Sequence, residues 1–123
     1  MLTASEAQEF AKSWIQAWNS HNLDAIMSHY AVDVVLVSPL AAKIVNSASG
    51  SIHGQAALRS YFSRGLEAYP NLAFTILDVL FGVSSILIYF VNEAGVRTGE
   101  LMEFGQEGKV VRVVATKANL PPK

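Results

Sequence analysis

The chain has 123 residues, a formal net charge of -1 and no cysteine. This length is typical of one domain with one core, so we expect a single domain over residues 1–123. Without cysteine, disulfides and thiol catalysis are excluded, and without a basic field a nucleic-acid partner is not expected. The longest apolar run, residues 86–91, is far shorter than the roughly 20 residues that cross a membrane. Since no signal-peptide pattern precedes it, we expect a cytoplasmic protein that does not contact a membrane.

Two N-terminal segments have apolar residues at helical spacing. Over residues 7–18 they recur every three or four positions, and Thr3 with Glu6 has the pattern of a capping box. Asn22 can cap a second helix, in which residues 23–30 repeat the same spacing. We therefore expect two amphipathic helices with bulky aromatic side chains on their apolar faces.

A strand, a loop and a third helix are expected next. Residues 34–37 read Val-Val-Leu-Val and end shortly before Pro39, which is typical of a short strand. Residues 40–53 contain many small polar side chains without periodicity, which predicts a surface loop. After Gly54, apolar residues up to Tyr69 recur at helical spacing, and a Pro-Asn pair ends this third helix.

Four strands complete the expected fold. Short segments rich in turn formers separate residues 72–81, 86–92, 96–104 and 109–117. Short turns of this kind connect neighbouring strands of an antiparallel meander. The order of elements predicts an α+β domain with its helices on one face of the sheet.

The predicted strands include two that are apolar on nearly both faces. Residues 86–91 and 110–114 lack the alternation of a strand with one face in water, and hydrophobic residues make up 51% of the chain. The helices would cover one face of the sheet. A second copy packed against the outer sheet face would cover the other, so we predict a homodimer. The alternative is a sheet bent so strongly that it covers itself.

Three segments also carry a family resemblance. They are W-x-x-A-W-N-S-H-N-L-D-A-I-M-S-H-Y, G-Q-A-A-L-R-S-Y-F and M-E-F-G-Q-E-G-K-V-V-R. Together they resemble the nuclear transport factor 2-like superfamily, especially its SnoaL-like and ketosteroid isomerase-like branches, over about residues 5–116. The family's Tyr/Phe-Ala-Asp-Asp tetrad here has Val32 at its third position. The resemblance implies a cystatin-like cone, in which a strongly curved antiparallel sheet wraps three N-terminal helices and leaves an apolar pocket between them.

Aromatic residues on the helices are candidates for the lining of this pocket. In the superfamily, the helix positions that Trp14 and Tyr61 match tend to face the cavity. Both side chains have a polar tip that needs a partner when buried. Trp18 is a third candidate, for which packing in the core is the alternative.

Alternate residues of a strand point to the same face of the sheet, and this rule gives two acids and two apolar residues as further candidates for the pocket. Glu100 shares a strand face with Met102, and Asp78 shares one with Ile76, so we expect both acids to point toward the apolar pocket. Burial there would raise the pKa of a carboxyl group, which could then donate a hydrogen bond or act as a general acid or base. Met102 and Val113 would add apolar lining. The alternative for Glu100 is pairing with a neighbouring side chain at the pocket rim.

The resemblance also argues against steroid isomerisation. The ketosteroid isomerase-like branch has an aspartate base just before the proline that ends the first strand, where this chain has Ser38. A serine hydroxyl cannot take a proton from carbon without a base of its own. The oxyanion-hole tyrosine of that branch corresponds to Trp14 and its protonated aspartate to Glu100. Trp14 and Glu100 are therefore a candidate pair for polarising a carbonyl group.

Two functions are left open. In the first, the hydrophobic pocket binds a small apolar molecule and the protein is an acid/base enzyme of the cyclase or isomerase type, with Glu100 acting beside Trp14, Ser38 or Tyr61. In the second, it is a non-catalytic ligand-binding or dimerisation module. No two of the three histidines have the spacing of metal ligands, so we expect no metal and no other cofactor.

Overall fold

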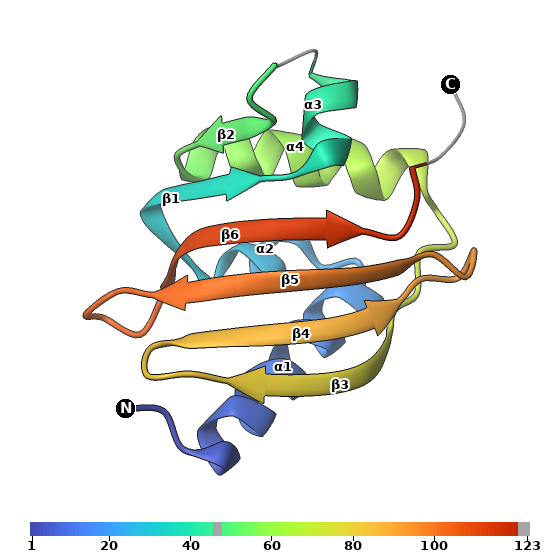
Figure 1. Ribbon diagram of the computed structural model, residues 1–123. Coiled ribbons are helices and arrows are strands. Elements are labelled where there is room, and N and C mark those ends of the chain that lie inside the picture. Colours follow the sequence, from blue (N-terminus) through green and yellow to red (C-terminus); the bar gives the residue numbers. More distant parts are fainter. Residues whose placement is uncertain (46–47, 121–123) are drawn as a thin grey trace.

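The computed structural model describes residues 1–45 and 48–120. Its helices are α1 (Ala4–Asn19), α2 (Leu23–Met27), α3 (Pro39–Ile44) and α4 (Gln55–Ala68). Its strands are β1 (Tyr30–Val37), β2 (Ser51–His53), β3 (Thr75–Phe81), β4 (Ser85–Val91), β5 (Arg97–Phe104) and β6 (Val110–Lys117). The expected α+β class is confirmed, and α1, α2 and α4 lie behind the sheet in the view of Figure 1.

The described strands form one sheet in the order β2-β1-β6-β5-β4-β3. Neighbouring strands are antiparallel except β1 and β6, which run parallel, with Leu36 opposite Val113. The sheet is therefore mixed rather than wholly antiparallel. Hairpin signals along the chain specify only neighbours joined by short turns, whereas β1 and β6 are far apart in sequence. The strong curvature expected for the sheet stays a prediction.

The segment predicted as a surface loop, residues 40–53, contains two regular elements. Pro39 begins α3 at its first turn, and the Ser38 hydroxyl caps this helix by accepting a hydrogen bond from the Leu40 N–H at 3.2 Å. Strand β2 then pairs antiparallel with β1. The loop prediction is wrong for these two elements because a proline that ends a strand can equally start a helix. Residues 46–47 lie outside the described part of the chain.

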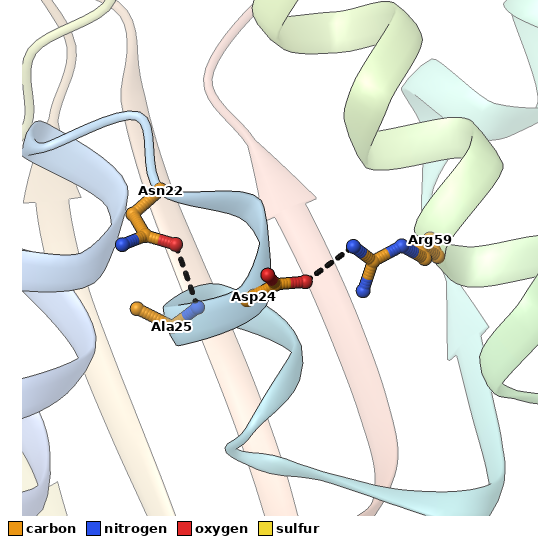
Figure 2. Close-up of polar contacts among 4 residues, drawn as sticks. All are labelled: Asn22, Asp24, Ala25 and Arg59. Atoms are coloured by element: carbon orange, nitrogen blue, oxygen red, sulfur yellow. Dashed lines mark hydrogen bonds and ion pairs between the residues drawn. The ribbon is translucent and has the colours of Figure 1, made fainter.

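Both helix caps expected from the sequence are confirmed. The Thr3 hydroxyl accepts from the Glu6 N–H at 3.1 Å, while the Thr3 N–H donates to the Glu6 carboxylate at 2.9 Å. The Asn22 side chain accepts from the Ala25 N–H at 3.1 Å at the start of α2 (Figure 2). Each cap satisfies a backbone donor that the first turn of a helix leaves without an intrahelical partner.

An ion pair connects α2 to α4. The Asp24 carboxylate pairs with the Arg59 guanidinium, as Figure 2 shows. Their side chains are 82% and 48% exposed, so water screens the pair and it contributes little to stability. Packing of the helices against the sheet must therefore hold them in place.

The inner face of the sheet forms the core with the helices. On β4, Ile86, Ile88 and Phe90 are buried, and Met102 and Val113 continue this layer on β5 and β6. The residues between them on β4 point to the outer face and are only half-buried. No helix among residues 1–45 and 48–120 is long and apolar enough to cross a membrane. The cytoplasmic location stays a prediction.

Gly50 directly precedes β2 and is hydrogen-bonded to Ser38, the residue that caps the start of α3. Its carbonyl oxygen accepts a hydrogen bond from the Ser38 N–H at 3.0 Å, and its φ of +66° lies in the left-handed region. A Cβ at this position would lie 2.7 Å from the backbone oxygen of Ser38. That oxygen already accepts from the Ala42 N–H at 3.1 Å inside α3, so it cannot move away cheaply.

We expect Gly50→Ala to lower the free energy of unfolding by about 2 to 4 kcal/mol, because left-handed backbone strain adds to the clash with Ser38. Gly95→Ala is the matched control, since Gly95 has a φ of +82° with no atom within 4 Å of an added Cβ. The control should lose only about 1 to 2 kcal/mol. Urea unfolding followed by tryptophan fluorescence measures both, and equal losses would contradict the proposed clash.

Candidate functional site

A cavity of about 110 Å³ lies between the helices and the inner face of the sheet. Four of the residues predicted for the site line it: Trp18, Ser38, Tyr61 and Glu100. Most of the remaining wall is apolar. We call this cavity the inner chamber.

A second hollow of about 380 Å³ adjoins the inner chamber. The two share five lining residues, which are Leu40, Tyr69, Leu72, Phe74 and Lys117. The second hollow extends past the turn between β4 and β5 and the residues that follow β6. We call it the vestibule.

Glu100 is the acid of the inner chamber. On β5 it lies opposite Ala115 of β6 and Ile88 of β4, two residues of the inner sheet face. Burial raises the pKa of its carboxyl group from 4.5 to about 7, and the nearby Lys117 ammonium opposes this rise. The side chain borders the chamber, so a molecule there could reach it. At neutral pH such a carboxyl group is present in both protonation states, which suits a general acid or base.

Ser38 and Tyr61 bring two hydroxyl groups to the chamber. Ser38 is only 5% exposed, because the turn from β1 into α3 encloses it. Burial raises the pKa of Tyr61 on α4 to about 12, and the nearby Ser38 hydroxyl opposes this rise. Both hydroxyls therefore stay protonated at neutral pH and can donate hydrogen bonds, but neither can serve as a base unaided.

Trp18 contributes a buried donor without a partner. Its side chain borders the chamber and is 8% exposed, and its indole N–H makes no hydrogen bond with any described residue. The N–H is close enough to the Tyr30 hydroxyl to lower the pKa of that group, yet the geometry does not make a hydrogen bond. An unpaired buried donor costs about 1 to 3 kcal/mol, so the indole N–H would gain from any acceptor atom that came within its reach.

Trp14 does not line the chamber, contrary to the prediction. It is 1% exposed, and its indole N–H donates to the Tyr30 hydroxyl at 3.0 Å. Its ring stacks on Phe74 and meets Phe90 edge to face. Trp14 and Trp18 share one face of α1, and only Trp18, one turn later, reaches the chamber wall.

Three further predicted residues also lie elsewhere. The register of β3 against β4 shifts between Ile76 and Asp78, so Asp78 lies opposite Tyr89 and is exposed on the outer face. The expectation that Asp78 points inward is wrong because a bulge inverts strand parity. Met102 and Val113 are on the inner face as expected, but both are fully buried in the core and border neither chamber nor vestibule.

The sequence reasoning missed several lining residues. Leu40 and Ile44 belong to α3, which was expected to be loop, and Tyr69 follows the last turn of α4. Lys117 shares the inner strand face with Ala115 on β6, so parity alone could have found it. A lysine at the end of a strand is, however, usually solvated, and nothing in the sequence marks this one as different.

The described residues contain no metal-binding cluster. Within residues 1–45 and 48–120, no three His, Asp or Glu side chains group so that they could hold a metal ion. His53 is exposed at the end of β2, and the His21 ring hydrogen-bonds the Leu72 carbonyl oxygen at 2.7 Å. The absence of a metal and of other cofactors stays a prediction.

The chain is thus an α+β domain whose helices pack on one face of a mixed sheet. An acid and several hydrogen-bond donors surround its apolar chamber. The family model of the SnoaL-like domain matches residues 11–116, and the chain belongs to this family. Among curated proteins, none matches the sequence significantly.

Solved structures agree with this assignment. A SnoaL-like protein of unknown function from Burkholderia thailandensis is 36% identical, with a TM-score of 0.92 over 95% of this chain and 98% of that chain. A candidate ketosteroid isomerase from Kribbella flavida is 19% identical, with a TM-score of 0.71 over 97% and 84% of the chains. A candidate polyketide cyclase from Sinorhizobium meliloti is 12% identical, with a TM-score of 0.74 over 94% and 100%. The last two share the fold alone.

The raised pKa of Glu100 makes stability depend on pH. Below about pH 4.5 the carboxyl group is protonated whether the chain is folded or not. As the pH rises toward 7, the unfolded chain loses this proton first, so the folded protein loses stability until its own pKa is passed.

We therefore expect the stability advantage of Glu100→Gln over wild type to grow as the pH rises from about 5, and to reach about 2 to 3 kcal/mol by about pH 8. Urea unfolding at a series of pH values measures this difference. Glu103→Gln is the matched control, because Glu103 is on the outer face of the same strand with its side chain 48% exposed. If the free energies of unfolding of wild type and Glu100→Gln changed with pH in parallel, the burial of the Glu100 carboxylate would be contradicted.

Proposed function

We propose that the chain binds a small apolar carbonyl compound in the inner chamber and that Glu100 acts on it as a general acid or base. The observation that carries the proposal is the position of Glu100, whose pKa is raised to about 7, on the wall of an apolar chamber. The SnoaL-like family supports it, since structural neighbours of the chain include proteins described as candidate isomerases and cyclases.

The residues around the chamber have complementary roles in this chemistry. The ionised Glu100 takes a proton from the carbon next to the carbonyl group, and the carbonyl oxygen becomes an enolate. The free indole N–H of Trp18 donates a hydrogen bond to that oxygen and stabilises its charge. Return of the proton from Glu100 to a different carbon gives isomerisation. Attack by the enolate carbon on a second carbonyl group closes a ring instead, and Glu100 then returns its proton to the alkoxide that forms.

Ser38 and Tyr61 position the substrate in this scheme. Their hydroxyls are protonated and can bind a second oxygen of the ligand. Ser38 corresponds to the aspartate base of the ketosteroid isomerase-like branch, so in this proposal the proton is taken instead by Glu100, two strands away on β5. Trp18 takes the carbonyl-polarising role that the sequence suggested for Trp14.

We expect the wild-type protein to accelerate exchange of the α-protons of cyclopentanone with deuterated water, followed by proton NMR. Glu100→Gln should lower the rate at least about 100-fold, because the amide cannot accept the proton. Glu103→Gln should leave the rate unchanged, since Glu103 is on the outer face. Exchange that survives Glu100→Gln, or is absent in the wild-type protein, would refute the acid/base role.

A second proposal concerns the outer face of the sheet. Leu80 and Leu101 are 52% and 39% exposed there, and the half-buried Leu87 and Tyr89 lie between them on β4. Contiguous apolar patches of this kind on a sheet face mark interaction sites. We infer a homodimer that packs this face against its copy, which would also be the role of the chain if it has no catalytic activity.

We expect light scattering after size-exclusion chromatography to give twice the 13.3 kDa chain mass at micromolar concentration. Leu101→Glu should produce monomers, because two carboxylates would be buried across the two-fold axis. Val32→Glu is the control, since Val32 is 78% exposed on β1, three strands away from β4. A monomeric wild-type protein would rule out the dimer.

A further inference from the structure

Lys117 is the cation shared by the inner chamber and the vestibule. Of the five residues that line both, it alone carries a charge. It follows Ala115 on the inner face of β6, and its ammonium donates to the Thr98 hydroxyl at 3.3 Å across the strand pair. The side chain is therefore held at the junction of the two spaces.

The ammonium of Lys117 is incompletely satisfied. Within residues 1–45 and 48–120 it forms no ion pair, and the Thr98 hydroxyl accepts only one of its three N–H donors. It lies near enough to Glu100 to oppose the rise in pKa of that carboxyl group, but the two are not in salt-bridge contact. The carboxylate of Glu93 at the vestibule accepts from the Ala73 N–H at 3.3 Å instead. Lys117 thus has donors left for an anion.

The positions of Lys117 and Glu100 set the distance that a ligand touching both side chains would have to span. Glu100 lies opposite Ala115, and Lys117 is two residues further along β6, so the two are diagonal neighbours on one sheet face. Such neighbours lie roughly 7 to 8 Å apart, with their Cβ atoms somewhat closer. A ligand that met both side chains would carry two oxygen groups separated by a few carbon atoms.

The volume of the inner chamber limits what lies deep in the site. At about 110 Å³ it is smaller than the roughly 150 Å³ apolar cavity that holds benzene. A short acetyl or propionyl end fits there, whereas a fused ring system does not. The vestibule, at about 380 Å³, has room for the rest of a larger molecule.

We propose that the ligand is an oxo acid, whose carbonyl end enters the inner chamber toward Trp18 and Glu100 and whose carboxylate binds Lys117 at the junction. This names the substrate class of the site in the proposed function and rests on that proposal for the place of the carbonyl group. Lys117 is then the residue that selects anionic over neutral carbonyl compounds.

The test compares levulinate with levulinamide, two probes of the same shape that differ in charge. Titrations followed by amide chemical shifts of the full chain measure both affinities. We expect levulinate to bind wild type at least about 10-fold more tightly than the amide. Lys117→Met should abolish this preference, and Lys117→Arg should retain it. Lys109→Met, which removes a cation outside both spaces, is the matched control and should keep the preference.

The outcomes separate the two proposals. Equal binding of the two probes by wild type, binding of neither, or a preference that survives Lys117→Met would overturn the role of Lys117. Thermal unfolding of Lys117→Met and Lys117→Arg excludes a folding defect as the cause of lost binding. A charge preference without exchange of the α-protons of levulinate would refute the acid/base chemistry and leave the oxo-acid ligand. Exchange of these protons without a charge preference would leave the acid/base chemistry and refute the role of Lys117.

Discussion

The candidate site depends on the cost of placing one carboxyl group against the apolar face of a sheet. Glu100 occupies a position that the pleat of β5 directs toward the helices, where a charged form is poorly solvated, and its pKa rises to about 7 as a result. The same poor solvation strengthens every hydrogen bond and charge interaction in the chamber. The nearby Lys117 ammonium opposes the rise, and the pKa of the acid lies close to neutral pH.

Strand periodicity predicted part of this arrangement and failed where the strand is irregular. It placed Glu100 on the inner face because β5 pairs with β4 in unbroken register. It misplaced Asp78 because one extra residue in β3 turns the following side chains over. The sequence around that bulge contains neither glycine nor proline, so no local signal announced it. The fold class is less sensitive to such an error, because it depends on the order of many elements.

Helical periodicity has a different limit. It correctly grouped Trp14 and Trp18 on the buried face of α1, and both caps expected ahead of α1 and α2 are present. Helical periodicity could not tell which of the two indoles borders a cavity, because that depends on how much space the side chains packed against α1 occupy. Phe74, Phe90 and Tyr30 enclose Trp14, whereas the chamber that Trp18 borders is also lined by residues of α3, a segment that was expected to be loop.

The polar groups of the chamber come from separate elements, and this separation explains how one scaffold can serve different reactions. Trp18 is on α1, Ser38 at the start of α3, Tyr61 on α4, and Glu100 and Lys117 on adjacent strands. The strands pair through backbone groups, so each of these side chains can be exchanged without altering the pairing of the sheet. The Ser38 hydroxyl takes no proton from carbon without a base of its own, yet Glu100 supplies an acid two strands away in the same sheet. Function in this fold must therefore be argued from the set of side chains around the chamber.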